Sequence, residues 1–324
     1  MSQSRLMTIA EQSAHFLNRP QGGPPPGPVT GAAAWCAPDL GGAEDWSERL
    51  SPELVAAVDA AMARVRGRDL DALGPADVGL EGQAATVARW RETLASGRGF
   101  LVLRGAPVER WDLAEQKLFM RVLGLQFGRL GFNNPQGDVI GEVRDTGAAS
   151  RDPHARLYAT SGEFRFHCDA ADLVGLLCVR PAMTGGDSRI ASSSTVYNEL
   201  RRRRPDLAAK LFRPMPFDLR NEQAADAAPF AEMTPCTFDG DRLYTFYISD
   251  YFRSVERHGV AVDRDLLDTY DALAEEPGVG LKFRLEAGDI QILNNHALLH
   301  ARTAFEDAPG HERLLLRFLV SVGA

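Results

Sequence analysis

The sequence predicts a mainly β protein with flanking helices, built around a sandwich or jelly-roll core. Two observations lead to this fold class. From about residue 170 onward, short β-like runs alternate with Gly, Pro, Asp and Asn. Before that point, apolar residues recur at helical spacing instead. Many short strands in the second half of a chain are typical of a sandwich or a jelly roll.

The composition is that of an ordinary soluble globular protein, with 44% hydrophobic and 25% charged residues in 324 positions. A net charge of −8 argues against sequence-independent binding to nucleic acid or an anionic membrane, because both need a positive surface. The four cysteines show no C-x-x-C pairing, and nowhere do 18 apolar residues run together. We expect a cytoplasmic protein with reduced thiols and with no nucleic-acid or membrane partner. The sequence leaves its oligomeric state open.

Residues 1–50 are expected to form an N-terminal arm, and residues 51–324 a single domain. The Pro/Gly-rich stretch 20–28 cannot sustain a helix or a central strand, and we expect loose order before it. N-terminal helices are predicted from Ser51, from about Gln83 and from Asp112, because capping or turn residues there precede apolar residues at helical spacing. Residues 99–105 follow the second helix and read as a buried strand.

The second half of the chain is predicted to contain short strands, interrupted by helices. The strands are expected over residues 173–179, 188–191, 242–248, 280–285, 289–293 and 314–320. The helices are expected over residues 193–203, 205–212 and 263–274. Two long stretches, 131–165 and 214–236, have little periodicity, and insertions of this length are typical of lids or binding loops.

A candidate metal site begins at His167 and Asp169, which form an H-x-D motif. In an extended strand, residues two apart point to the same side, so both groups can reach one metal. With seven histidines and 44 acidic residues in the chain, about one such motif arises by chance, so the motif alone is weak. A third ligand must come from elsewhere, and both His300 and His296 are candidates. Two imidazoles and one carboxylate leave three metal positions open, as in non-haem Fe(II) oxygenases.

Arg313 and Arg317 are four residues apart in a predicted strand, so their side chains share one face. If that face is buried, the two guanidinium groups require an anion. A dicarboxylate that chelates a metal at one end and meets an arginine at the other would satisfy both charges. The alternative is that both arginines lie exposed along the strand.

The order of these motifs resembles that of a known family. H-x-D is followed by Gly185-Gly186-Asp187-Ser188, by Gly288-Asp289, by Asn294-Asn295, by His300 with Arg302-Thr303-Ala304-Phe305, and by Arg313 and Arg317. This order is similar to that of the taurine dioxygenase-like and clavaminate synthase-like Fe(II)/2-oxoglutarate-dependent oxygenases, from about Gly99 to the C-terminus. The resemblance implies a double-stranded β-helix core, that is, a jelly roll of cupin-like type.

The resemblance also implies the metal ligands and the reaction. His167, Asp169 and His300 would bind Fe(II), which favours His300 over His296 as the third ligand. The family's enzymes use O2 to decarboxylate 2-oxoglutarate to succinate and hydroxylate an unactivated C–H bond. Halogenating relatives have a small residue at the position of Asp169, so the carboxylate here argues for hydroxylation. Desaturation or ring formation would use the same ligands.

Three further residues gain roles from the resemblance. Arg313 would bind the distal carboxylate of 2-oxoglutarate, and Ser188 stands where the family usually has a threonine that hydrogen-bonds that carboxylate. Arg317 would help to hold the near carboxylate or an anionic group of the substrate.

The substrate is expected to be a small amino-acid-like molecule or an amine. Polar side chains suited to a zwitterion are Asn133, Asn134, Tyr158, Glu163 and Arg165, with Arg317 beside them. Relatives act on amino acids, amines, sulfonates or peptide-like natural products, which favours a role in secondary metabolism. Two other classes are considered. A zinc-type hydrolase or lyase on the same triad would need no dicarboxylate site, whereas a non-catalytic 2-oxoglutarate-binding protein would keep only the fold.

Overall fold

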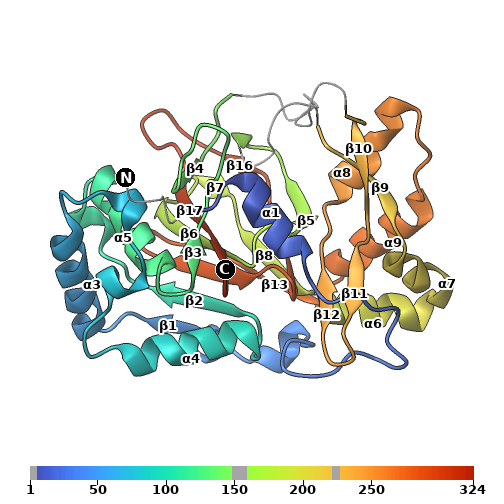
Figure 1. Ribbon diagram of the computed structural model, residues 1–324, viewed down its shortest axis with the longest axis horizontal. Coiled ribbons are helices and arrows are strands. Elements are labelled where there is room, and N and C mark those ends of the chain that lie inside the picture. Colours follow the sequence, from blue (N-terminus) through green and yellow to red (C-terminus); the bar gives the residue numbers. More distant parts are fainter. Residues whose placement is uncertain (1–5, 148–158, 221–226) are drawn as a thin grey trace.

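Two β-sheets form the centre of the molecule, and helices cover their outer faces (Figure 1). The computed structural model describes residues 6–147, 159–220 and 227–324. The larger sheet has the strand order β1-β2-β14-β6-β17-β3, with β4 paired to β17, and the smaller sheet has the order β13-β8-β15-β5. The predicted fold class, mainly β with flanking helices, is confirmed.

The strands of the two sheets come from widely separated parts of the chain. The larger sheet contains β1 (Ser47–Arg49), β2 (Phe100–Arg104), β3 (Arg129–Leu130), β4 (Gly141–Val143), β6 (Leu173–Arg180), β14 (Ile290–Asn294) and β17 (Leu314–Ser321). The smaller sheet contains β5 (Phe164–His167), β8 (Ser188–Ser192), β13 (Gly280–Phe283) and β15 (Leu298–Arg302). In the part of the chain that the structure describes, three strand pairs lie outside them: β7 (Thr184–Gly185) with β16 (Phe305–Glu306), β9 (Met215–Asp218) with β10 (Phe230–Met233), and β11 (Cys236–Phe238) with β12 (Leu243–Thr245).

The helices form two groups along the chain. The N-terminal group contains α1 (Ile9–Leu17), α2 (Ala43–Trp46), α3 (Pro52–Val65), α4 (Ala84–Ala95) and α5 (Leu113–Gly124). The later group contains α6 (Ser193–Arg203), α7 (Pro205–Ala208), α8 (Ser249–Ser254) and α9 (Arg264–Glu275). The predicted caps are present: the Ser51 hydroxyl accepts from the first turn of α3, and Asp112 accepts from the first turn of α5.

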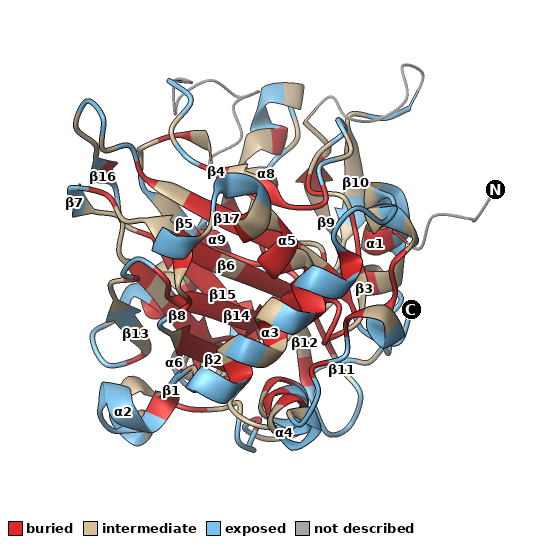
Figure 2. Cartoon of the chain, turned by 90° about the vertical axis from the view of Figure 1, so that its left-hand side faces the viewer, coloured by how far each residue is buried: buried red, intermediate tan, exposed pale blue. Residues whose placement is uncertain are grey.

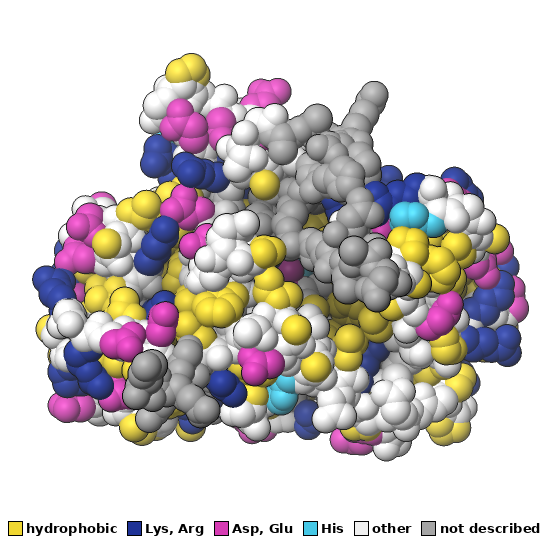
Figure 3. Space-filling model, turned by 45° about the horizontal axis from the view of Figure 1, so that its top comes forward, with side chains coloured by type: hydrophobic (Ala, Val, Ile, Leu, Met, Phe, Trp, Pro, Cys, Tyr) yellow, Lys and Arg dark blue, Asp and Glu magenta, His cyan; other side chains and the backbone are white. Residues whose placement is uncertain are grey.

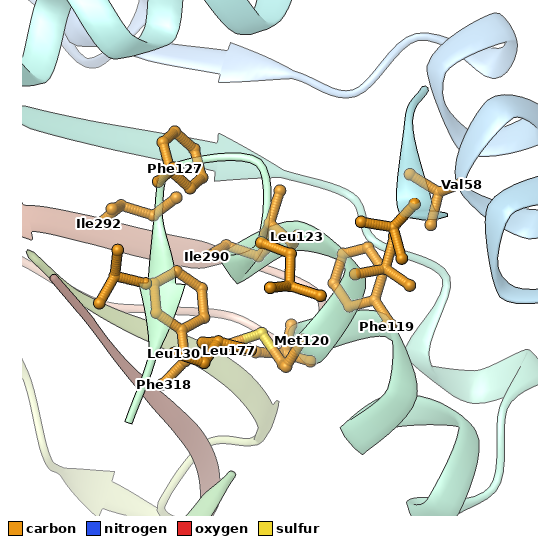
Figure 4. Packing of buried hydrophobic residues seen from close by; sticks show 14 of the residues in the cluster. Val58, Phe119, Met120, Leu123, Phe127, Leu130, Leu177, Ile290, Ile292 and Phe318 are labelled. Carbon is orange, nitrogen blue, oxygen red and sulfur yellow. The ribbon is translucent and has the colours of Figure 1, made fainter. Parts of the chain in front are cut away.

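Because side chains alternate between the two faces of a strand, neighbouring apolar residues pack in separate cores. Along β14, Ile290 and Ile292 pack with residues of α3, α4 and α5, whereas Leu293 packs between the two sheets. Leu123 of α5 lies beside Ile290, and Phe127 lies beside Ile292 (Figure 4). Figure 2 shows the buried central strands behind α3, whose outer side is exposed.

The N-terminal arm is packed against the domain. Thr8 and Glu11 form a capping box at the start of α1, and Met7 forms a parallel bridge with Gly131. The expectation of loose order before residue 20 is therefore wrong for α1. β1 also lies within residues 1–50 and adds a parallel edge strand to the larger sheet. Residues 20–28 form neither helix nor strand, as predicted.

Part of the second long insertion is also regular, because β9 and β10 form an antiparallel pair inside residues 214–236. The expected strand over 242–248 is shorter, since β12 ends at Thr245. None of the helices in the described ranges is long and apolar enough to cross a membrane. On the face seen in Figure 3, basic and acidic side chains are interspersed among hydrophobic patches.

Candidate metal centre

Two histidines lie opposite each other on neighbouring strands of the smaller sheet. His300 of β15 pairs with His167, the last residue of β5, and their ring centroids are 4.1 Å apart. Asp169 follows in the loop after β5, with its Oδ2 3.6 Å from His300 Nε2. One ligand atom from each of the three residues lies within 4.8 Å of the others. The structure therefore brings together the three residues that the sequence nominated as metal ligands.

An irregularity in β5 shapes this site. His300 is opposite His167 but Arg302 is opposite Phe164, so β5 has one more residue than β15 between these two pairs. The extra residue places the rings of Phe164 and His167 together, with stacked centroids 3.7 Å apart. The Phe164 ring thus packs against the imidazole and limits its rotation.

A buried asparagine fixes the loop that carries the carboxylate. Asn295, in the turn before β15, accepts a hydrogen bond from the backbone N–H of Asp169 at 3.2 Å. Its side-chain amide donates to the carbonyl oxygen of Ala171 at 2.7 Å. Because Asn295 also lies close in sequence to His300, it ties the third candidate ligand to the H-x-D segment.

The protonation states suit a divalent metal. His167 Nδ1 lies 2.8 Å from the carbonyl oxygen of Arg165 and donates to it, which leaves Nε2 as the ligand atom. Burial, together with the nearby His300, lowers the pKa of His167 to about 3, so this imidazole is neutral at pH 7. Burial alone would raise the pKa of Asp169, but Arg317 and His300 hold it below its ordinary value. A neutral imidazole and an ionised carboxylate are the forms that bind metal, so the residues fit the ion.

His296, the other candidate for the third ligand, is engaged elsewhere. Its Nε2 lies 2.8 Å from Asp172 Oδ1, and its ring stacks on Phe16 of α1 with centroids 4.2 Å apart. Among the residues whose positions are described, the cluster of ligand atoms contains His300 and does not contain His296. The geometry agrees with the preference for His300.

A cavity beside the triad, here called the inner cavity, is lined by three arginines. They are Arg302, Arg313 and Arg317, and Ser188 and Gln291 lie with them. Arg317 and Leu315 lie two residues apart on one face of β17. Arg313, immediately before the strand, is two residues before Leu315 and faces the same side. All three arginines are buried, which excludes the alternative that Arg313 and Arg317 lie on an exposed strand face.

Arg313 and Arg302 together form a cationic end of the inner cavity. Their guanidinium carbons lie 5.0 and 4.7 Å from the centroid of the Phe305 ring. Burial lowers the pKa of Arg313 to about 10, and burial with the neighbouring Arg313 charge lowers the pKa of Arg302 to about 9. Within the described ranges, Arg313 Nη1 and Arg302 Nε have no hydrogen-bond partner. Buried charges of one sign favour an anion between them.

Ser188 lines the inner cavity together with Arg313. It is the first residue of β8, and its hydroxyl donates to Gln291 Oε1. Gln291 and Arg302 are site residues to which the sequence analysis gave no role. The sequence could have indicated Gln291, because it is the one polar residue within the apolar run Ile290–Leu293. A signal for Arg302 also existed, because it lies two residues after His300 and so shares its strand face.

Arg317 lies between Asp169 and Asn133. Its Nη1 is 3.3 Å from Asp169 Oδ1, and its Nε donates to Asn133 Oδ1 at 2.8 Å. The other end of the Asn133 amide donates to the carbonyl oxygen of Val139 at 2.8 Å. Asn133 was expected to bind substrate, but both ends of its amide are already used, and one of them positions Arg317.

The other expected substrate residues lie away from the triad. Asn134 forms hydrogen bonds with Asp138 in an exposed turn. The Glu163 carboxylate pairs with Arg189 at 2.6 Å and is half exposed, and Arg165 points toward a separate surface pocket that also contains Glu163. The structure does not bring these three residues to the cavities beside the metal site. Tyr158 lies outside the described residues.

A second and larger space, here called the outer chamber, adjoins the inner cavity. Both are lined by Phe164, His167, Asp169 and Arg317, so the metal site lies where they meet. The remaining walls of the outer chamber come from α1, from Phe132 and Asn133 after β3, from β9 and β10, from Leu319 of β17, and from the segment between β12 and α8, and they are mainly apolar. Arg313 lines the inner cavity and not the outer chamber, so a molecule in the outer chamber would reach the metal site from a different space than a molecule held by Arg313.

Comparisons with known proteins agree with this geometry. The sequence model of the family "Taurine catabolism dioxygenase TauD, TfdA family" matches residues 66–319. FR-33289 synthase from Streptomyces rubellomurinus is 29% identical over 310 residues, which cover 91% of each chain.

Two solved structures are similar in fold. One is asparagine oxygenase in complex with Fe(II), 2S,3S-3-hydroxyasparagine and succinate, with a TM-score of 0.68 and 18% identity over 85% of this chain and 93% of that chain. The other is the non-haem iron oxygenase OrfP in complex with Fe and alpha-ketoglutaric acid, with a TM-score of 0.62 and 17% identity over 85% and 94%. The chain belongs to the TauD, TfdA family and is an oxidoreductase that depends on Fe(II) and 2-oxoglutarate.

Proposed function

We propose that His167, Asp169 and His300 bind Fe(II), and that the enzyme hydroxylates an unactivated C–H bond of a small amino-acid-like or amine substrate. The observation that carries this proposal is the meeting of the triad and the buried Arg313 at one cavity. Iron bound there supplies the oxidising chemistry, in which O2 and 2-oxoglutarate give succinate, CO2 and the hydroxylated product.

Other residues of the site bind the co-substrate and exclude water. Arg313 receives the distal carboxylate of 2-oxoglutarate through a charge-assisted hydrogen bond, and the Ser188 hydroxyl adds a second one when it turns from Gln291 Oε1 to donate to the carboxylate. Arg317, held by Asn133, lies beside Asp169 and faces either the near carboxylate of 2-oxoglutarate or an anionic substrate group. Phe164 covers the His167 ring and excludes water from that side.

The amino-acid-like substrate is supported by the fold neighbour that was solved with 3-hydroxyasparagine. Asn134, Glu163 and Arg165 give this substrate class no support, because they lie away from the cavities. A cytoplasmic location and a role in secondary metabolism remain part of the proposal. All four cysteines are free, and three of them are buried, which suits a reducing compartment.

The two other classes fit the site less well. A zinc hydrolase or lyase has no use for a buried arginine with an unpaired nitrogen beside the metal. A non-catalytic binding protein has no need for an intact set of three metal ligands beside the cavity.

The test is succinate release from 2-oxoglutarate under air with added Fe(II), across the proteinogenic amino acids and a series of amines. We expect at least one compound to stimulate succinate release, and Asp169→Ala to abolish it. The matched control is Asp268→Asn, an exposed carboxylate on α9, which should retain full activity. Activity that requires Zn(II) and consumes no 2-oxoglutarate would contradict the proposal, as would the absence of stimulation by every compound.

A further inference from the structure

The outer chamber is closed on one side by α1, which lies before the part of the chain matched by the family. The family match begins at residue 66, whereas α1 covers Ile9–Leu17. Ile9, Gln12, Ser13 and Leu17 all line the outer chamber, and their spacing of three to four residues places them on one face of the helix. This wall is therefore supplied by the chain's own N-terminal segment.

Contacts along its whole length hold α1 in place. At its start, the backbone N–H of Met7 donates to Leu130 O, and the N–H of Phe132 donates to Met7 O. At its end, His15 Nε2 lies 3.0 Å from Asp172 Oδ2, and the Phe16 ring stacks on His296. The helix is thus fixed to the loop after β3 and to the turn before β15, and the side chains that it directs into the chamber have defined positions.

Gln12 has an unused acceptor on this face. The side chain is 2% exposed, and its Nε2 donates to the carbonyl oxygen of Phe132 at 3.0 Å. That bond fixes the amide orientation, so Oε1 is the remaining atom. In the part of the chain that the structure describes, Oε1 has no hydrogen-bond partner. A buried acceptor without a partner destabilises the protein, because it has lost its hydrogen bonds to water. A hydrogen-bond donor on a bound molecule would remove this destabilisation.

The rest of the outer chamber offers little polar surface. Phe217, Met233, Phe246, Ile248 and Tyr251 line the outer chamber and not the inner cavity. The carboxylate of Asp218, which also lines the chamber, is already paired with Arg257 at 2.8 Å. An apolar body in contact with these side chains would be stabilised by burial, whereas a short, highly polar side chain would not.

We infer that α1 determines substrate specificity, and that Gln12 Oε1 accepts a hydrogen bond from an N–H group of a substrate whose body is apolar. This inference rests on the proposed function and narrows its substrate class to amino acids or amines with an apolar side chain. Gln12 is a binding residue in this assignment, and it takes no part in the chemistry at the metal.

The experiment measures binding to the full-length enzyme loaded anaerobically with Fe(II) and 2-oxoglutarate. The probes are L-leucine and L-phenylalanine, compared with L-asparagine and L-arginine, in calorimetric titrations. We expect the two apolar amino acids to bind at least about tenfold more tightly than the two polar ones. Gln12→Met should weaken their binding by about tenfold, because one hydrogen bond is lost, while the affinity for 2-oxoglutarate stays the same.

Two further variants separate recognition from folding. Ala14→Gln places the same amide on the exposed side of α1 and should change nothing. Ser13→Leu narrows the chamber and leaves the hydrogen bond from Gln12 to Phe132 in place. It should weaken the binding of L-phenylalanine more than that of L-leucine. Tighter binding of L-asparagine or L-arginine, binding of none of the four probes, or equal binding by wild type, Gln12→Met and Ser13→Leu would overturn the inference. Binding that responds to these variants without any succinate release would instead overturn the proposed function.

Discussion

His300 and His167 face each other across the ladder between β15 and β5, so the register of this one strand pair sets the geometry of the metal site. Because side chains alternate along a strand, a slip of one residue would turn His300 away from the cavity and bring Leu299 or Ala301 to its place. The two neighbours of His300 pack in the core under the smaller sheet, which penalises such a slip.

Replacing His300 and His296 separately tests the choice of the third ligand. We expect His300→Ala to lower the affinity for Fe(II) by at least about 100-fold, since a direct ligand contributes more than the groups that orient it. His296→Ala should leave the affinity unchanged, because His296 is paired with Asp172. Equilibrium dialysis followed by metal analysis measures both values. Loss of iron in the His296 variant alone would show that the assignment is wrong.

Replacing Arg313 tests the co-substrate site. We expect Arg313→Met to raise the KM for 2-oxoglutarate by about 100-fold, because a charged hydrogen bond worth about 2–3 kcal/mol is lost in a buried cavity. The control is Arg180→Met, which removes a half-exposed arginine of β6 that pairs with Glu312. Succinate release at varied 2-oxoglutarate gives the KM. An equal KM in the two variants would exclude Arg313 from the site.

Asp172 links α1 to the body of the protein and makes that link dependent on pH. Burial alone would raise its pKa, but hydrogen bonds from His296 and from the Val322 N–H hold the pKa below its ordinary value. A carboxylate of this kind contributes stability above its ordinary pKa and loses that contribution as the pH falls through the folded value. Asp172→Asn should lower the free energy of unfolding by about 1–3 kcal/mol at pH 7.

The difference between wild type and Asp172→Asn should shrink as the pH falls below about 4, where the carboxylate becomes protonated. Urea denaturation at a series of pH values measures it. A difference that stays constant from pH 7 to pH 3 would mean that the charge of Asp172 does not stabilise the fold.

Gly175 of β6 lies against the ring of Phe318 on β17. A Cβ at residue 175 would come 2.1 Å from Phe318 Cζ, and the ring is fully buried. Gly175→Ala should therefore destabilise the protein by about 1–3 kcal/mol through overpacking. Adding Phe318→Leu should recover part of that loss, so the two effects should not be additive. Urea denaturation of the two single variants and the double variant measures the three losses in free energy of unfolding. Additive losses would show that the Phe318 ring does not determine which side chains fit at residue 175.

The sequence predicted the parts of the fold that depend on local patterns. The helix caps at Ser51 and Asp112 and the strands β6, β14 and β17 were predicted because capping residues and apolar runs signal them directly. β15 was not predicted as a strand, although it carries His300. It is five residues long, and its pairing with β8 and β5 involves residues more than 100 positions away.

The candidate site was predicted where residue type alone identifies the chemistry. His167, Asp169 and His300 meet as expected, and Arg313 is buried beside them. The substrate residues could not be predicted in this way, because whether a polar side chain faces a cavity depends on tertiary packing. Glu163, for instance, pairs with Arg189 at the surface, whereas Gln12, in a segment expected to be loosely ordered, lines the outer chamber.

An anaerobic titration of the enzyme with Fe(II) and 2-oxoglutarate, followed by visible absorption, tests the assignment of the metal ligands together with that of Arg313. We expect a charge-transfer band that needs both additions, because 2-oxoglutarate would bind the iron at one end and Arg313 at the other. The band should disappear in His300→Ala and need far more 2-oxoglutarate in Arg313→Met. A full band in His300→Ala, or none in the wild type, would mean that Fe(II) and 2-oxoglutarate do not bind at this triad.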